Sequence, residues 1–182
     1  LEAGLLYAGT DDGLIHVSQD DGGSWRSIEV GSLPGVPDRA FINDIRADLH
    51  DADTVYVALD NHKYGDFSPY LLVSKNRGRS WKKITSGIPD RHLVWRLVQD
   101  HVRPELMFAA TEFGVFATFD AGKAWYKLSG GMPTISIRDI QIQRRENDLV
   151  AASFGRGFFV MDDYTALRDI DPSDFDAGAA LF

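Results

Sequence analysis

The stretch Ser18-Gln19-Asp20-Asp21-Gly22-Gly23-Ser24-Trp25 holds the pattern that decides the fold, because it returns twice in the same form. The second copy reads Ser74-Lys75-Asn76-Arg77-Gly78-Arg79-Ser80-Trp81, and the third reads Thr118-Phe119-Asp120-Ala121-Gly122-Lys123-Ala124-Trp125. In each copy a hydroxyl residue comes first, Asp or Asn lies two places on, Gly follows after two more, and Trp ends the stretch. The tryptophans lie 56 and 44 residues apart, a spacing typical of folds built from repeated β-sheets.

Each residue type in this pattern suits a tight turn between two strands, so we call the three stretches the repeat turns. We expect the Asp or Asn side chain to accept hydrogen bonds from backbone N–H groups two residues on, and the Gly to adopt a positive φ. The hydroxyl group would satisfy other backbone groups of the turn, and the Trp would pack between neighbouring sheets. Asn76 cannot act as an acid or a base, which favours a structural role over a catalytic or calcium-binding one. Ala124 replaces the usual hydroxyl residue, so the third turn should be less well braced. The residues with these structural roles are Ser18, Asp20, Gly22, Trp25, Ser74, Asn76, Gly78, Trp81, Thr118, Asp120, Gly122 and Trp125.

Short apolar stretches between Gly, Pro and Asp residues predict many brief strands. Pro34, Pro89 and Pro133 each follow a last strand and mark the step to the next unit. We therefore predict an all-β fold, a β-propeller segment of about three and a half to four blades, each of four antiparallel strands. The predicted blades span residues 1–34, 35–89, 90–133 and 134–163. Their expected strands are 5–9, 14–18 and 25–29; 41–47, 54–60, 70–74 and 81–85; 94–99, 106–111, 115–119 and 125–129; and 137–143, 149–153 and 158–162.

The repetition stops after Asp163, where no Gly or Trp follows. We expect residues 164–182 to form a non-repeat extension, in which residues 180–182 could add a closing strand. Blade one lacks its first strand, and natural sheets rarely leave such an edge uncovered. The chain opens at Leu1 and enters a strand almost at once, which favours a piece of a longer protein. We expect the remaining propeller blades, or a second copy of the chain, to cover the edge.

Composition narrows the classes of partner. Charged residues make up 25% of the chain and the net charge is −8, which disfavours nucleic acid and anionic membranes as partners. The absence of cysteine excludes disulfides, thiol nucleophiles and thiolate metal sites. No apolar stretch has the length of a membrane span, so we expect no membrane insertion.

The three repeat turns resemble the Asp-box, or BNR repeat, of sialidases, sortilin-like receptors and many secreted bacterial proteins. The segments Gly9-Thr10-Asp11-Asp12-Gly13 and Gly155-Arg156-Gly157-Phe158-Phe159, with residues 60–70, extend the resemblance. They resemble large exported bacterial proteins related to the sortilin (VPS10-like) propeller, which are usually described as BNR or glycosyl-hydrolase-like. The resemblance covers about residues 5–170. It implies a propeller fold and export to the periplasm, cell surface or exterior, and it leaves the function open.

In an up-and-down blade, the repeat turns share one end with the links between strands one and two. The links between strands two and three, and those between blades, lie at the opposite end, where we expect ligands to bind. The alternative is that this end is polar simply because solvent covers it. The residues that we place there are Asp11, Asp12, Arg39, Asp60, Asn61, His62, Lys63, Tyr64, Asp66, Arg91, His92, Glu112, Phe113 and Arg156.

The loop expected at residues 60–69 is the strongest candidate for recognition, because it lengthens blade two and mixes aromatic, acidic and basic groups. A spacer loop that packs on a neighbouring domain is the alternative. The ligand-binding candidates are Asp60, His62, Tyr64, Asp66 and Arg156.

Glycoside hydrolysis would need two carboxylates about 5 to 9.5 Å apart. The catalytic candidates are Asp11, Asp12, Asp66 and Glu112. The five histidines show no paired ligand spacing. The close acids Asp169, Asp171, Asp174 and Asp176 lack the glycine and terminal glutamate of an EF-hand, so we interpret them as a solvated acidic tail. We expect no metal and no cofactor.

These observations favour a binding or scaffolding module of an exported protein that recognises a peptide, protein or glycan. A glycoside hydrolase, sialidase-like or polysaccharide-cleaving, is the first alternative. The second is a purely structural propeller segment.

Overall fold

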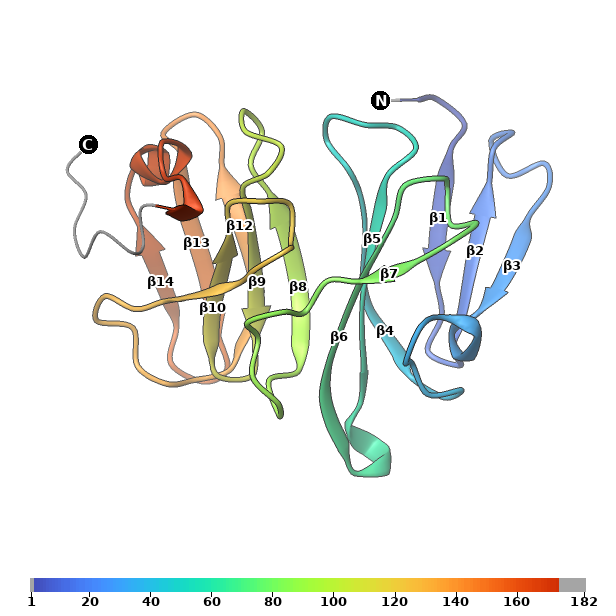
Figure 1. Ribbon diagram of the computed structural model, residues 1–182, viewed down its shortest axis with the longest axis horizontal. Helices are drawn as coiled ribbons and strands as arrows, with labels where there is room; N and C mark the ends of the chain where they lie inside the picture. The colour runs from blue at the N-terminus through green and yellow to red at the C-terminus, as the bar shows by residue number, and fades with distance from the viewer. Residues whose placement is uncertain (1, 174–182) are drawn as a thin grey trace.

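The computed structural model describes residues 2–173, which form 14 β-strands in four antiparallel sheets (Figure 1). In chain order we call the sheets blades one to four. Blade one contains β1 (Leu6–Gly9), β2 (Leu14–Ser18) and β3 (Arg26–Glu29); blade two contains β4 (Phe41–Ala47), β5 (Val55–Asn61), β6 (Asp66–Ser74) and β7 (Lys82–Lys83). Blade three contains β8 (Val94–Gln99), β9 (Met107–Thr111), β10 (Gly114–Thr118) and β11 (Tyr126–Leu128); blade four contains β12 (Ile137–Gln143), β13 (Asp148–Ser153) and β14 (Phe158–Met161). The predicted all-β fold is confirmed. The closing strand expected at residues 180–182 lies outside the described residues.

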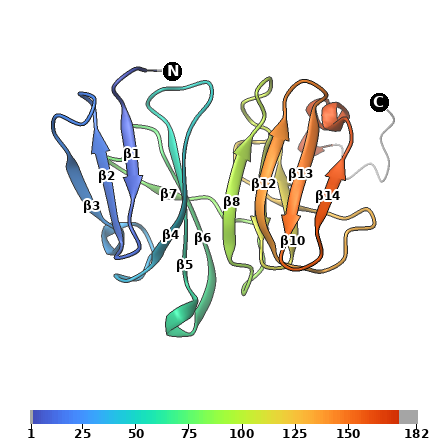
Figure 2. The same ribbon diagram turned by 180° about the vertical axis from the view of Figure 1, so that it is seen from behind.

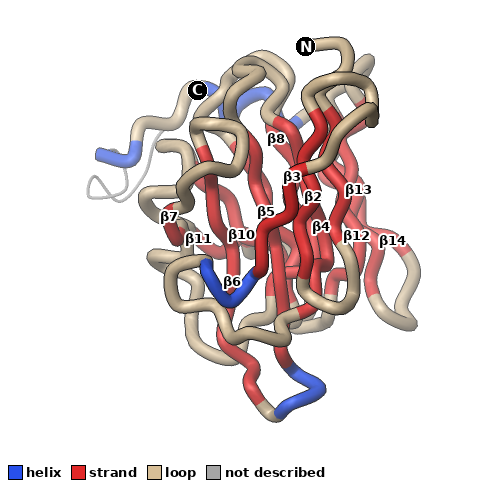
Figure 3. Tube along the Cα trace, turned by 90° about the vertical axis from the view of Figure 1, so that its right-hand side faces the viewer, coloured by secondary structure: helices blue, strands red, loops and turns tan. Residues whose placement is uncertain are grey.

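Sequence order and sheet order coincide in every blade, so each blade is an up-and-down meander. The blades stand side by side, as two opposite views show (Figures 1 and 2), and they overlap in a view along the row (Figure 3). Blade one carries its repeat turn between β2 and β3, which are therefore its third and fourth strands. Among residues 2–173, blade one has no first strand and blade four has no fourth strand. No helix in the described part of the chain is long and apolar enough to cross a membrane.

The stretch expected as a loop at residues 60–69 forms a hairpin instead, with a register shift between Leu59 and Asn61. Strand β5 continues to Asn61, a short 3-10 helix η2 (His62–Tyr64) turns the chain, and β6 begins at Asp66. Asn61 pairs with Asp66 across the hairpin. Polar residues dominate this stretch, so periodicity alone did not indicate strands. The hairpin projects beyond the ends of the neighbouring strands (Figure 1).

The repeat turns have the predicted glycine geometry but a longer reach of the acidic side chain. Gly22, Gly78 and Gly122 have φ values of 90°, 76° and 83°. In the first turn the Asp20 carboxylate accepts a hydrogen bond from the Ser24 backbone N–H at 2.8 Å, four residues on. The prediction of a hydrogen bond to the N–H group two residues on is therefore wrong. The backbone N–H groups point toward the carboxylate only after the chain has turned back, three to four residues on.

The third repeat turn lacks one hydroxyl contact, as its alanine predicted, but the expected weaker bracing is wrong, because Asp120 accepts two backbone hydrogen bonds where Asp20 accepts one. Asp120 accepts backbone hydrogen bonds from Lys123 and Ala124 at 2.9 and 3.0 Å. The corresponding hydroxyl of the first turn, Ser24 Oγ, adds a further hydrogen bond to the carboxylate of Asp20 at 2.7 Å. Ala124 has no atom for this contact.

Two of the three repeat-turn tryptophans, Trp81 and Trp125, pack against the preceding blade. Trp125 is 3% exposed, and its Nε1 donates to the carbonyl oxygen of Ile84 in blade two at 2.6 Å. Trp81 is partly buried and packs against the core between blades one and two. Trp25 is 46% exposed, because no blade precedes blade one among the described residues. The prediction of packing between blades therefore holds where the preceding blade is present.

Among the described residues, blade four ends in a short helix rather than a fourth strand. Hydrogen bonds from Tyr164 and Arg168 to the buried Asp100, which we call the polar lock, hold this helix in place. Asp163 caps the 3-10 helix η3 (Tyr164–Arg168) by accepting a hydrogen bond from the Thr165 N–H. The fully buried Asp100, in the β8–β9 turn, accepts hydrogen bonds from the Tyr164 hydroxyl at 2.5 Å and from Arg168 at 2.9 Å. Burial opposes ionisation, but these hydrogen bonds outweigh it and lower the pKa of Asp100 to about 2. The charge pair fixes η3 against blade three.

Candidate ligand-binding site

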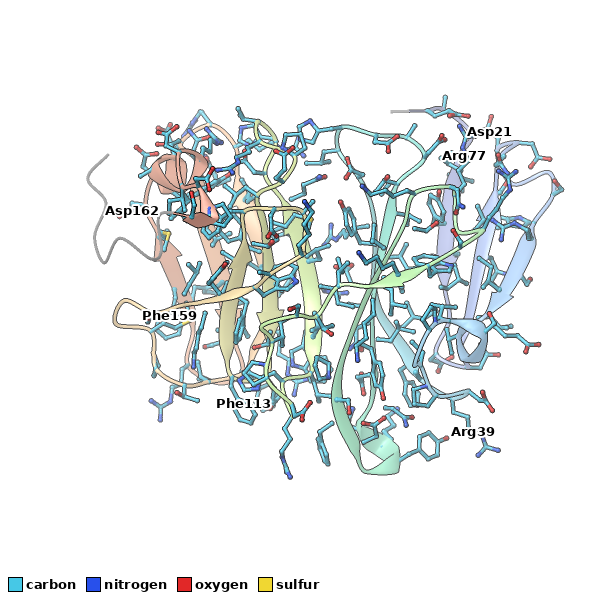
Figure 4. All side chains as sticks on the ribbon, viewed as in Figure 1. Asp21, Arg39, Arg77, Phe113, Phe159 and Asp162 are labelled. Carbon is cyan, nitrogen blue, oxygen red and sulfur yellow. The ribbon has the colours of Figure 1, made fainter. Side chains whose placement is uncertain are left out.

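The two ends of the blades differ, as the up-and-down topology requires. Figure 4 places Asp21 and Arg77, from repeat turns, at one end, and Arg39 and Phe113, from the links, at the other. The links between second and third strands all lie at the end opposite the repeat turns. We call this end the link face.

The link face contains a cavity of about 220 Å³ where blades two, three and four meet. This volume is below that of drug-sized ligand pockets, so it suits one sugar ring or one or two amino-acid side chains. Four residues that the sequence placed on this face line it together, and four others join them. The lining residues are His62, Arg91, Glu112 and Phe113, with Phe67, Leu93, Trp95 and Arg138.

Glu112 is held at the centre of one wall. Its Oε2 accepts hydrogen bonds from Trp95 Nε1 and Ser136 Oγ, both at 3.0 Å. The same oxygen lies 3.7 Å from the guanidinium of Arg138. Arg138 lies over the Trp95 ring at 3.8 Å from its centroid. The negative face of the indole ring attracts the planar cation of Arg138, so the stacking stabilises it beside the cavity.

The opposite wall comes from the projecting hairpin. Asp60 is 2% exposed and its carboxylate is hydrogen bonded to the ring Nδ1 and the backbone N–H of His62. The His62 ring meets the Trp95 ring edge-on at 6.0 Å. Asp60 is therefore placed to orient His62 from below the surface rather than to touch a ligand.

Arg91 provides the second cation at the rim. Its guanidinium lies 5.3 Å from the centre of the Phe67 ring, which is 40% exposed. Among the described residues, neither Arg91 nor Arg138 donates a hydrogen bond. Two guanidinium groups beside aromatic rings, of which Arg138 is ion-paired with Glu112, suit a ligand that combines apolar surface with acceptor oxygens.

Asp66 has a structural environment inside the hairpin. Burial raises its pKa, but hydrogen bonds from the Tyr70 hydroxyl at 2.5 Å, from Ser68 and from Asn61 hold the pKa below its ordinary value. Burial and the same contact raise the pKa of Tyr70 to about 12. A carboxylate with a lowered pKa is a poor proton donor near neutral pH.

The remaining predicted residues lie elsewhere on the link face. Tyr64 is 57% exposed and stacks on Phe41 at 6.5 Å, on the side of the hairpin away from the cavity. Asp12 lines a separate open hollow of blade one, and the exposed Asp11 precedes it in the same turn. Arg156 is exposed in the β13–β14 turn between two glycines of positive φ, as expected.

The sequence missed Trp95 and Arg138 as site residues. Both lie on first strands, β8 and β12, which the sequence analysis predicted as strands without assigning them a role in binding. The signal that could have found them is a large aromatic residue and an arginine near the start of adjacent inner strands. Within residues 2–173, no group of three or more His, Asp or Glu side chains is placed to hold a metal ion.

No protein-family model and no curated protein matches the chain. The solved structures to which it is similar include a GH74 xyloglucanase from Xanthomonas campestris, with 18% sequence identity and a TM-score of 0.67, where the match covers 91% of this chain and 28% of the enzyme. The extracellular domain of a putative one-component system from B. thetaiotaomicron matches at 18% identity with a TM-score of 0.67 over 91% of this chain and 20% of that chain. The β-propeller domain of Myceliophteria thermophila Cps50 matches at 15% identity with a TM-score of 0.62 over 93% of this chain and 52% of that chain.

These similarities identify the fold as a β-propeller segment. The identities are below 25%, so they establish the fold alone. The chain spans about a fifth to a half of the length of these three structures.

Proposed function

We propose that this chain is a binding or scaffolding module of a larger exported propeller protein, and that it recognises a peptide, protein or glycan through the link-face cavity. The observation that carries the proposal is the convergence of three blades on one cavity with two arginines, neither of which donates a hydrogen bond within residues 2–173, although Arg138 is ion-paired with Glu112. Phe67 and Phe113 supply apolar surface at 40% and 36% exposure. A few placed polar groups among aromatic rings are typical of small ligand sites.

Export is proposed from two sources. The first is the resemblance of the repeat turns to the Asp-boxes of BNR and sortilin-like proteins, to which we propose that this chain is related. The second is the extracellular domain among the structural neighbours. The remaining propeller blades, or a second copy of the chain, are the proposed neighbours of the open edges.

A glycoside hydrolase is the second candidate, because one structural neighbour is a GH74 xyloglucanase. The candidates Asp11 and Asp12 belong to blade one, while Glu112 lies in blade three and Asp66 has a lowered pKa. A general acid needs a raised pKa, so Asp66 fits this role poorly. A screen of the protein on xyloglucan, sialosides and other polysaccharides separates the two candidates, because a pure binding module gives no turnover.

The binding proposal is tested with glycan and peptide arrays probed with the full chain. We expect Arg91→Ala and Phe113→Ala to weaken binding of any array ligand by about tenfold or more, because each removes a contact at the cavity rim. Arg79→Ala is the matched control, since Arg79 is an exposed arginine at the repeat-turn end. Ligands that bind all three variants like the wild type would refute the cavity as the site. Equal loss with Arg79→Ala would point to non-specific charge attraction and refute it as well.

A further inference from the structure

The repeat-turn tryptophans Trp81 and Trp125 each fill a slot on the preceding blade, and the slot between blades two and three shows its construction. The indole N–H of Trp125 donates to the Ile84 carbonyl oxygen, and its backbone N–H donates to the Ser86 carbonyl oxygen at 2.8 Å. A Cβ on Gly87 would lie 2.3 Å from the Trp125 carbonyl oxygen, so the acceptor loop fits closely around the tryptophan. Ile88 completes the buried cluster that holds Trp125.

Blade three contains a corresponding segment, which differs in backbone conformation at Gly130, where φ is 128°. The acceptor segment Ile84-Thr85-Ser86-Gly87-Ile88-Pro89 corresponds to Leu128-Ser129-Gly130-Gly131-Met132-Pro133. Gly87 and Gly131 share the same backbone conformation, with φ values of 90° and 86°. The strands also correspond: Phe116 pairs with Ala109 in blade three, and Phe159 pairs with Ala151 in blade four.

The blade-three slot has no tryptophan, because the chain turns into η3 after β14 instead of forming a repeat turn. A cavity of about 240 Å³ stands in its place, lined mainly by apolar groups of blades three and four that include Leu128, Met132 and Phe159. Leu128 and Met132 are only partly buried, whereas their counterparts Ile84 and Ile88 are 5% and 7% exposed. Figure 4 shows Phe159 beside the loop that follows β11.

The outer edge of β14 is open at the same place. Within residues 2–173, β14 pairs only with β13, so one row of its backbone N–H and C=O groups has no strand partner. In the two preceding blades this position is occupied by a strand headed by tryptophan, β7 after Trp81 and β11 after Trp125. The cavity and the edge therefore form one continuous surface of the same kind as the filled interface between blades two and three.

We propose that this surface binds an outer β-strand headed by a tryptophan, supplied from outside residues 1–182. The indole would enter the cavity between Leu128 and Phe159, and the strand would pair antiparallel with β14. The structural neighbours support a source outside this sequence, because the chain spans only about a fifth to a half of their length. The proposal is independent of the link-face cavity.

A fluorescein-labelled peptide with the sequence of residues 118–129 tests the proposal by fluorescence anisotropy with the full chain. This probe carries the third repeat turn, its tryptophan and the strand that follows. We expect saturable one-to-one binding, weakened about tenfold or more when the peptide carries Trp125→Ala. Equal binding of both peptides, or no binding of either, would overturn the proposal.

Variants of the protein locate the contact. Phe159→Asp places a charge in the cavity and should weaken peptide binding about tenfold or more, while Phe158→Asp, on the other face of β14 at 74% exposure, should leave it within about twofold. Met161→Asp serves as a second cavity variant if circular dichroism finds Phe159→Asp unfolded. Equal effects of the variants on the two faces of β14 would refute the assigned site.

Two other occupants would overturn the proposal. A dimer in sedimentation velocity that Phe159→Asp abolishes would assign the surface to a second copy of the chain. A tenfold gain in peptide affinity with the double variant Leu181→Asp and Phe182→Asp would assign it to the end of this chain.

Discussion

The three repeat-turn tryptophans occupy equivalent positions in sequence but very different surroundings, so substitution by alanine should have graded effects. Trp125 is 3% exposed between two blades, while Trp25 is 46% exposed. Removal of a fully buried tryptophan costs about 3–5 kcal/mol, because the apolar contacts are lost and a cavity remains. Trp125→Ala also leaves the Ile84 carbonyl without its donor. We expect Trp25→Ala to cost about 1 kcal/mol or less and Trp81→Ala to lie between the two.

Urea unfolding followed by far-UV circular dichroism measures this series, because each unfolding midpoint is read from a variant's own transition and the signal comes mainly from the backbone. A stability of 5–15 kcal/mol is usual for a domain, so Trp125→Ala should shift the midpoint strongly at an unchanged slope. Trp125→Phe is the control that keeps most of the apolar volume and loses only the indole N–H. Equal destabilisation by Trp25→Ala and Trp125→Ala would refute the reasoning, since it would place the energy in the turn itself rather than in the contact with the preceding blade.

Two further predictions concern the polar lock and a repeat-turn glycine. Because the pKa of Asp100 is lowered to about 2, its contribution to the free energy of unfolding is complete above about pH 4 and is lost as the pH falls through about 2. Arg168→Gln should remove much of this acid sensitivity. We expect the difference in unfolding free energy between pH 7 and pH 2.5, measured with urea, to shrink by about 2 kcal/mol in the variant. If the variant and the wild type lose the same stability on acidification, the Asp100–Arg168 contact is not its cause. Gly122→Ala should lower the thermal unfolding midpoint more than Gly35→Ala. Both positions have positive φ, but a Cβ at 122 would lie 2.9 Å from the Ile84 side chain, whereas a Cβ at 35 would have nothing within 4 Å. Equal shifts of the midpoint would mean that backbone strain alone sets the cost.

The strands of the blades could be predicted closely because their residues carry local signals. Strand β8 begins at Val94 and ends at Gln99 as predicted, since a β-branched and apolar stretch is bounded by turn residues. The hairpin at residues 60–69 could not be predicted as strands, because its pairing depends on the neighbouring strand rather than on its own polar residues. The same reason explains why Arg138 was overlooked. An arginine inside a predicted strand gives no sign of the tryptophan on the next blade on which it stacks.

The repeat turns themselves determined the blade register and the two ends of each blade. A hydroxyl, an Asp or Asn and a glycine within a few residues interact mainly with one another, so local chemistry is sufficient to form the turn. The sequence also placed His62, Glu112 and Arg91 at the end opposite these turns. Tertiary structure alone decided which of the face residues share a cavity, because that depends on how three blades approach one another. It likewise decided that Trp125 is buried and Trp25 exposed, since the difference comes from the presence or absence of a preceding blade.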